Sequence, residues 1–378
     1  MTAGERPIAR ALAVLAGLNL ALAVFVIATQ PERARDLNTM YDWCRQWLSG
    51  RVDLYRLPDA ATDYPPNAIV LFSPLALLPA RWLVPAWTIC SLALALLLPF
   101  VVVRTARSDR RWRTSTAIAV AAFLCWASAR TLLQFSVLSM TLAFSALWLE
   151  DAAPVASGIC LGLALVKPHI ALPVALWAVV SGRWRNVATA SMVVAAGVLA
   201  YCAYADASPF ETIPAYWRVL AATYSGADGL VGVTSVRRWA ASDAAWIAVA
   251  AALLTLLIAM AWTSRRATGL DRLAVVACGC LWSLLAFYHN GNNLILVLPA
   301  FVVMLAGAPL AALAAVQLAL MIDVPARLGG LVPPRGVLHT LVIDFDRLLV
   351  LAMLGAMVLF WWRHPPAVDK IDASPKGA

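Results

Sequence analysis

The stretch VPAWTICSLALALLLPFVVV, from Val84 to Val103, runs for 20 residues without a charged side chain. About 20 apolar residues in a helix cross the roughly 30 Å of hydrocarbon in a bilayer. Long apolar windows recur at 8–29, 244–262 and 341–362. The chain of 378 residues is 62% hydrophobic and 13% charged, and its mean hydropathy of +0.80 lies outside the range of soluble domains. The sequence therefore predicts an all-α polytopic membrane protein.

Apolar runs predict twelve transmembrane spans in one domain over residues 1–362. They cover 8–29, 83–103, 116–129, 132–149, 153–166, 168–180, 187–204, 244–263, 272–288, 293–307, 309–323 and 338–362. Several runs are short, so we expect those helices to be kinked, joined in pairs across a proline, or shielded from lipid by neighbours. The first run follows two arginines, as a signal peptide would. Because its apolar part is long and no small-residue cleavage site follows, we interpret it as a retained anchor.

Arginines in the short connections predict the orientation of the spans. Clusters at 104–113, 183–185 and 265–272 fall on one side in the twelve-span arrangement, together with the basic N-terminus and the tail at 363–378. The positive-inside rule assigns that side to the cytoplasm. We therefore expect an inner (plasma) membrane protein with both termini in the cytoplasm and a short, disordered tail.

Two long polar segments, 30–66 and 205–243, lie outside in this topology. The apolar segment 67–78 is too short for a span, and if it crossed the bilayer the arginines at 104–113 would face outward. We therefore expect 67–78 to be a re-entrant or interfacial helix. The first polar segment also carries aromatic side chains suited to the membrane interface, namely Tyr41, Trp43 and Trp47.

Several functional classes are not supported by the sequence. The net charge of +9 does not indicate a nucleic-acid partner, because the basic residues are spread over many short loops. Six of the seven cysteines lie in apolar runs, so no disulfide framework is predicted, and Cys278 and Cys280 are interpreted as packing residues. Signatures of nucleotide-binding loops, nucleophile elbows and zinc proteases do not occur. We expect no metal and no cofactor, and any donor substrate should be reachable from the membrane.

Polar residues in apolar surroundings are costly, so their positions indicate function. In the predicted topology four separate parts of the chain bring such residues to the outer side. They are Asp36 with the turn at 63–66, Gln134, the Lys167-Pro168-His169 break, and the connection at 288–293. The sequence therefore predicts that a site lies at the outer face of the membrane.

The two charged residues of this group each allow two interpretations. The carboxylate of Asp36 could act as a general base on a hydroxyl group, or it could be a solvated aspartate paired with Arg33 or Arg35. Lys167 stands beside a helix-breaking proline, which suits an anionic ligand such as a phosphate, whereas a lysine can also snorkel to the interface. The polar neighbour His169 favours a ligand site.

Two further polar segments are less specific. His289 and Asn290 could bind a phosphate or a sugar hydroxyl, although Asn-Gly chemistry alone would explain a turn there. Asp344, Asp346 and Arg347 could mark an ion path near the start of the last span. We interpret them instead as an ion pair of Arg347 with a neighbouring aspartate.

The opening of the chain resembles that of glycosyltransferase family 87. The residues that carry the likeness are Asp36, Tyr41, Gly50, Tyr55, Tyr64-Pro65-Pro66 and the run from Ser73 to Pro79. A second block is similar too, with Gln134 before a span and the glycine-rich segment from Ser157 to Pro168 that ends in lysine and proline. That family comprises bacterial membrane mannosyltransferases of the GT-C fold that use polyprenyl-phosphate-linked sugars.

The resemblance implies a GT-C-type bundle of about 12 transmembrane helices, with interfacial helices in the outer first loop. Asp36 would deprotonate an acceptor hydroxyl, which attacks the anomeric carbon opposite the phosphate and inverts its configuration. Lys167 and His289 would neutralise the departing lipid phosphate. The residues implied to shape the sugar pocket are Tyr64, Gln134, His169 and Asn290.

The resemblance also implies the partners of the protein. The donor would be a polyprenyl-phosphate sugar, carrying mannose or another hexose or pentose, and the acceptor a lipid or a glycan. The alternative class is a transporter or flippase of lipid-linked sugars, which twelve spans and intramembrane charges would also fit. The lack of visible internal symmetry and the one-sided clustering of polar residues favour the transferase.

Overall fold

The computed structural model describes residues 5–57, 62–106, 112–126, 129–225, 242–287, 291–306, 313 and 344–363. Within these ranges the regular elements are helices, and no strand occurs. In chain order the elements are α1 (Glu5–Thr29), η1 (Pro31–Arg33), α2 (Arg35–Gly50), η2 (Leu54–Arg56), α3 (Pro66–Phe72), η3 (Ser73–Leu77), α4 (Ala80–Ala106), α5 (Trp112–Trp126), α6 (Ala129–Leu132), α7 (Ser136–Leu149), α8 (Pro154–Ala164), α9 (Pro168–Val180), α10 (Trp184–Tyr204), α11 (Pro209–Ser225), α12 (Asp243–Thr263), α13 (Gly269–Ala286), η5 (Gly291–Val297), α14 (Leu298–Met304) and α18 (Phe345–Arg363).

Five helices are long and apolar enough to cross a membrane, namely α1, α4, α10, α12 and α13. Shorter apolar helices include α5, α7, α8, α9 and most of α18. The predicted span 309–323 lies outside the described residues except for residue 313, whereas each other predicted span coincides at least in part with helix. The structure is therefore that of a helical membrane protein, and the count of twelve spans stays a prediction.

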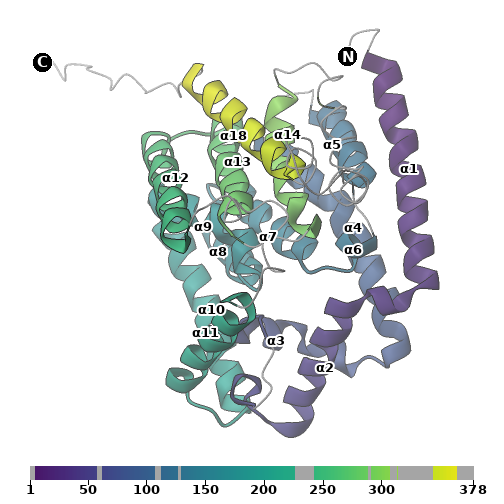
Figure 1. Cartoon of the computed structure of the whole chain (residues 1–378), viewed down its shortest axis with the longest axis vertical. Helices are drawn as coiled ribbons and strands as arrows, with labels where there is room; N and C mark the ends of the chain where they lie inside the picture. Colours follow the sequence, from purple (N-terminus) through teal and green to yellow (C-terminus); the bar gives the residue numbers. More distant parts are fainter. Residues whose placement is uncertain are drawn as a thin grey trace, which may run out of the picture.

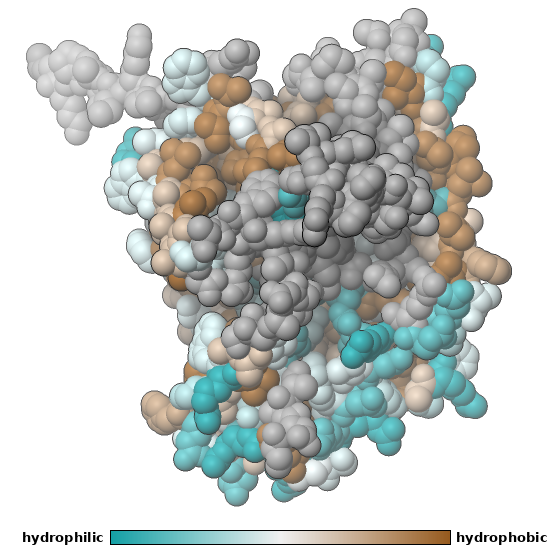
Figure 2. Space-filling view, in the orientation of Figure 1, coloured by the Kyte–Doolittle hydropathy of each residue, from teal (hydrophilic) through white to brown (hydrophobic). Residues whose placement is uncertain are grey.

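The two ends of the helical bundle differ in polarity. Figure 1 shows that α1 begins and α18 finishes at the same end of the molecule, which we call the terminal end. The opposite end, formed by α2, α3 and α11 with η2 and η3, carries most of the hydrophilic surface in Figure 2, and we call it the polar end. Hydrophobic surface follows α1 between the two ends. The described parts of the predicted outer segments therefore gather at one end of the bundle.

An ion cluster ties two connections and the first turn of α13 together at the terminal end. Asp151 lies 2.8 Å from Arg183 and 2.9 Å from Arg272. The buried carboxylate of Glu150 also pairs with Arg272 and accepts a hydrogen bond of 3.1 Å from the indole of Trp177. Because a buried charge is stable only with partners, this cluster fixes the connections that flank α8, α9 and α13 at one end.

The connection after α4, which belongs to the predicted arginine cluster at 104–113, begins close to the start of α13. Gly269, with φ of +57°, begins α13, and a Cβ atom there would lie 3.3 Å from the carbonyl oxygen of Ala106 at the end of α4. A positive φ is easily adopted only by glycine. The described parts of all three predicted arginine clusters thus share the terminal end.

Close contact between α8 and α10 explains the glycines of the segment that ends at Lys167. A Cβ atom at Gly158 would lie 2.5 Å from Cβ of Thr189, and one at Gly162 would lie 2.6 Å from Cβ of Val193. Two small residues four positions apart let helix backbones approach closely in membranes. The glycines therefore hold α8 against α10 and set the position at which the chain reaches Lys167.

The segment predicted to be re-entrant or interfacial forms α3 and η3 at the polar end. Seven α-helical and five 3₁₀ residues extend about 20 Å, which is less than the roughly 30 Å of hydrocarbon. Asn67 packs against α10, where a Cβ atom at Gly197 would lie 2.6 Å from Cβ of Asn67. This segment is too short to cross a bilayer by itself.

The prediction that Tyr41 and Trp47 lie in the membrane interface is wrong. Tyr41 is 6% and Trp47 4% exposed, on the buried face of α2. Trp47 stacks on Tyr201 of α10 with ring centroids 5.5 Å apart, and the Tyr41 hydroxyl donates to the carbonyl oxygen of Leu78 at 2.9 Å. The two rings gain more contact inside the protein than in the interface, because α2 packs its aromatic face against α3, η3 and α10.

Candidate active site

Asp36, Gln134 and Lys167 meet at the polar end of the bundle, although they come from three distant parts of the chain. Asp36 lies in the first turn of α2, Gln134 in the connection between α6 and α7, and Lys167 at the N-cap position of α9. Gln134 donates a hydrogen bond to Asp36 through Nε2 and accepts one of 3.0 Å from Lys167 Nζ through Oε1. A carboxylate needs a donor and an ammonium needs an acceptor, so the two partners fix the orientation of the amide.

The ammonium group of Lys167 is held inside the protein. The residue is 7% exposed, and its Nζ lies 5.8 Å from the ring centroid of Tyr64. The ammonium also interacts electrostatically with the carboxylates of Asp36 and Asp63. A buried cation with an amide, a ring face and nearby carboxylates is stable inside the protein and can attract an anion. This placement differs from that of a lysine snorkelling to water.

Asp36 is half-buried and does not form an ion pair with Arg35 in the part of the chain that the structure describes. The side chain of Arg33 lies outside that part. The carboxylate therefore faces Gln134, whose amide also binds Lys167. No described residue donates a hydrogen bond to its second oxygen, which could therefore accept a proton from a hydroxyl group, as a general base must.

Tyr64 is positioned by the segment that precedes it. The hydroxyl group of Tyr55 donates to the carbonyl oxygen of Tyr64 at 2.7 Å. The Tyr64 ring packs edge-on against Phe135, with centroids 5.7 Å apart, and contacts Trp43 at 6.4 Å. Burial raises the pKa of Tyr55 well above its ordinary value, so this hydroxyl stays protonated and remains a donor. Tyr64 thus forms a fixed aromatic wall beside Lys167.

Asp53 organises residues 51–57 and 62–65, which we call the roof segment. Its Oδ1 atom accepts hydrogen bonds of 3.2 Å from the Tyr55 backbone N–H and from the Tyr201 hydroxyl. Its Oδ2 atom accepts one of 2.7 Å from Thr212 of α11. A carboxylate with three donors holds the roof segment to α10 and α11, and through Tyr55 it supports the aromatic wall.

His169 joins a second set of contacts next to Lys167. Its carbonyl oxygen accepts a hydrogen bond of 2.8 Å from Ser283 of α13, and its Nε2 lies 3.5 Å from Nδ2 of Asn293. Asn293 in turn accepts a hydrogen bond of 2.9 Å from Ser136. Sequence reasoning did not select Ser136 or Asn293 as site residues. Asn293 could have been found, because it ends the polar connection at 288–293.

The remaining predicted residues fall in two groups. His289 and Asn290 lie outside the described residues, so their roles stay predictions. Arg347 pairs with Asp344, both buried, as the sequence interpretation expected, and the side chain of Asp346 is not described. Asp36, Tyr64, Gln134, Lys167 and His169 are thus the predicted residues that the structure brings together.

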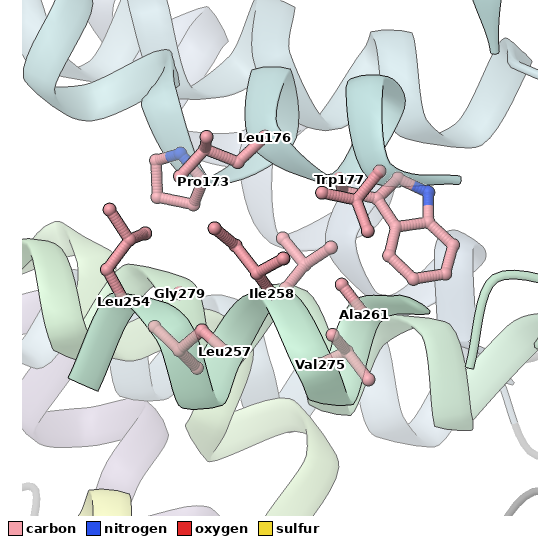
Figure 3. A pocket seen from close by; sticks show the side chains of 11 residues that line it. Pro173, Leu176, Trp177, Leu254, Leu257, Ile258, Ala261, Val275 and Gly279 are labelled. Carbon is pink, nitrogen blue, oxygen red and sulfur yellow. The ribbon is translucent and has the colours of Figure 1, made fainter. Parts of the chain in front are cut away.

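An apolar groove lies further along α9, between that helix, α12 and α13 (Figure 3). Figure 3 shows Pro173, Leu176 and Trp177 of α9 facing Leu254 and Ile258 of α12. None of the predicted site residues that the structure describes lines this groove. The groove offers contacts to hydrocarbon, whereas Asp36, Gln134 and Lys167 offer contacts to charged and hydroxylated groups.

The sequence model of glycosyltransferase family 87 matches residues 62–287 of the chain. The match covers more than half of the 378 residues and includes Tyr64, Gln134, Lys167 and His169, whereas Asp36 precedes it. No curated protein and no solved structure matches the chain.

Proposed function

Since the chain belongs to glycosyltransferase family 87, we propose that it transfers a sugar from a polyprenyl-phosphate donor to a hydroxyl group of a lipid or glycan acceptor. The sugar is mannose or another hexose or pentose. One observation carries the proposal: a single glutamine amide joins the carboxylate of Asp36 to the buried ammonium of Lys167. A base and a cation at the two ends of one amide suit a reaction that removes a proton at one point and develops negative charge at another.

In the proposed reaction Asp36 takes the proton of the acceptor hydroxyl as its oxygen attacks the anomeric carbon. The new bond from carbon to oxygen forms on the face opposite the phosphate, so the configuration inverts. The bond from the anomeric carbon to the phosphate oxygen breaks, and its electron pair leaves with the polyprenyl phosphate. Lys167 stabilises the charge that develops there, while Tyr64, Gln134 and His169 line the sugar pocket. His289 and Asn290 keep their proposed roles near the phosphate and the sugar.

Gln134 has a positioning role in this proposal. Because its amide contacts both charged groups, it sets the distance between the base and the ammonium before the substrate arrives. Holding reacting groups in place avoids the entropic cost of ordering them during the reaction. The Asp36 carboxylate is also kept from collapsing directly onto Lys167, which would remove both groups from use.

We propose that the polar end faces outward and the terminal end faces the cytoplasm of a cell with an inner membrane. Supporting this orientation, the described arginines of the three short connections lie at the terminal end. The site then opens to the outer leaflet, where a lipid-borne donor meets its acceptor.

Purified protein in liposomes tests the proposal. We expect Asp36→Asn to lower the transfer of labelled sugar from polyprenyl-phosphate mannose to a lipid extract by about 10²- to 10⁴-fold. Asp42→Asn, which changes an exposed carboxylate on the same helix, serves as the matched control and should keep the wild-type rate. An unaltered rate in the Asp36 variant would reject the base assignment. Movement of the lipid-linked sugar across the bilayer without product would instead favour a transporter or flippase.

A further inference from the structure

Helix α11 exposes large apolar side chains at the polar end of the molecule. Phe210 is 91%, Trp217 59% and Ile213 42% exposed. In Figure 2, hydrophobic atoms interrupt the hydrophilic surface at the lower left, where Figure 1 shows α11. Single exposed apolar residues are ordinary, but a contiguous set on one helix indicates a surface that contacts something other than water.

The side chains of α11 divide into three sectors. At about 100° per residue, Phe210, Ile213, Pro214, Trp217 and Ala221 fall within an arc of about 100°, and all of them are exposed. Charged residues at 211 and 218 follow on one flank of this arc. Buried residues at 212, 215 and 216 occupy the opposite side. An exposed apolar stripe with charges at its edge is typical of a helix lying in a membrane interface.

The chain places α11 at the edge of the membrane. α10 is one of the helices long and apolar enough to cross a bilayer, and it ends at Tyr204. Four residues, 205–208, separate it from α11, and they reach at most about 14 Å. Asp206, with φ of +51°, and a hydrogen bond of 2.9 Å from the Ala207 backbone N–H to the carbonyl oxygen of Cys202 make the turn tight. The start of α11 therefore lies close to the surface at which α10 leaves the lipid.

The opposite face of α11 reaches the roof segment. Thr212 donates to Asp53 at 2.7 Å, and the Tyr216 ring packs edge-on against Tyr55 with centroids 5.6 Å apart. Tyr55 holds the carbonyl oxygen of Tyr64, whose ring lies beside Lys167. α11 thus has an exposed apolar face on the protein surface and a polar, aromatic face toward the candidate site.

We propose that α11 lies in the bilayer interface, with Phe210, Ile213 and Trp217 in the acyl-chain region, and that it fixes the roof segment at the level of the lipid headgroups. The partner of this surface is the phospholipid bilayer. The proposal concerns membrane depth and not sugar transfer, so it can hold or fail independently of the proposed function.

Site-directed spin labelling in phosphatidylcholine and phosphatidylglycerol liposomes tests the proposal. Single cysteines replace Phe210, Ile213 and Trp217, and the controls Glu211→Cys and Arg218→Cys carry labels on the charged flank. The background variant is Cys90→Ala with Cys160→Ala, because these are the described cysteines that are not buried. Accessibility to dissolved oxygen and to a water-soluble nickel complex gives the depth of each label.

We expect the ratio of oxygen to nickel accessibility to be several-fold higher at 210, 213 and 217 than at 211 and 218. Equal ratios at the two sets would show that α11 stands in water, and the proposal would fail. An immobilised label shielded from both reagents at 210 and 217 would show a protein contact, such as a second copy of this chain, and would also reject it. If Phe210→Cys does not fold, judged by elution in detergent, Trp217→Cys on the same stripe decides the outcome.

Discussion

The carboxylate of Asp36 accepts a hydrogen bond from the side-chain amide of Gln134, although 98 positions separate the two residues in the sequence. The other end of the same amide is occupied by Lys167. Hydrogen bonds to charged groups contribute about 1.5–3 kcal/mol each, so the bridge is strong enough to order one loop and the starts of two helices around one point. Its chemistry gives the first two predictions.

Gln134→Glu should raise the pH needed for sugar transfer. The substitution places a second carboxylate against Asp36, and two adjacent carboxylates resist joint ionisation, so the pair titrates with one raised pKa. A base that must be deprotonated then becomes active only at higher pH. We expect the acidic limb of the kcat profile to move upward by about one pH unit or more. Gln134→Ala removes the bridge without adding charge, so it should lower kcat without moving the acidic limb. If the acidic limb of the kcat profile lies at the same pH in the wild type and in Gln134→Glu, the contact is contradicted.

Lys167→Met tests whether the buried ammonium serves the reaction. Methionine keeps much of the apolar stem and removes the charge. We expect kcat/KM to fall by about 10²- to 10³-fold, as for loss of one group that stabilises transition-state charge. Lys167→Arg should recover part of the loss, because it restores a cation. A wild-type kcat/KM in the methionine variant would show that the charge of Lys167 does not serve the reaction.

Gly158→Ala should destabilise the protein through the contact of α8 with α10. The added methyl group would lie 2.5 Å from Cβ of Thr189 and 2.7 Å from the carbonyl oxygen of Asn186, so the helices must separate. Overpacking of this kind costs about 1–3 kcal/mol. Thermal unfolding in one detergent should show a lower Tm. Gly17→Ala is the matched control, since no atom lies within 4 Å of its added Cβ, and a similar Tm loss in both variants would argue against close helix packing.

Cys44 should react slowly with maleimides in the folded protein. Burial raises the pKa of its thiol from 9.0 to about 12, so the thiolate fraction at pH 8 falls about a thousand-fold. Its Sγ also donates to the carbonyl oxygen of Ile69 at 3.6 Å. Mass spectrometry after N-ethylmaleimide treatment should show an unmodified Cys44 in mild detergent and a modified one in dodecyl sulfate. Equal labelling in the two detergents would mean that the buried face of α2 opens readily.

Much of the helical architecture could be predicted, because apolar runs in a membrane protein have few alternatives to helix. The approximate positions of α1, α4 and α12 follow from length and composition alone. The break at Lys167 was predictable for a similar reason, since a lysine beside a proline is conspicuous within apolar sequence. The family resemblance is confirmed by the match over residues 62–287.

The contacts within the site could not be predicted from the sequence in the same way. No periodicity links Asp36 to Gln134, and the contact of His169 with Asn293 depends on how α7, α9 and η5 pack. The aromatic residues of α2 misled the sequence analysis, because a tryptophan suits either an interface or a protein core. The spacing of Tyr41, Cys44 and Trp47 is that of one helix face, and this periodicity could have indicated burial.

Trp177 has a consequence for Lys167, ten positions earlier in the chain. α9 runs as one helix from Pro168 to Val180 with Pro173 inside it, so a rotation at one end of the helix also turns the other end. At the terminal end, the indole of Trp177 donates a hydrogen bond to Glu150, which restricts rotation of α9 about its long axis. The direction in which Lys167 points at the start of α9 therefore also depends on Glu150, about 15 Å away at the other end of the helix.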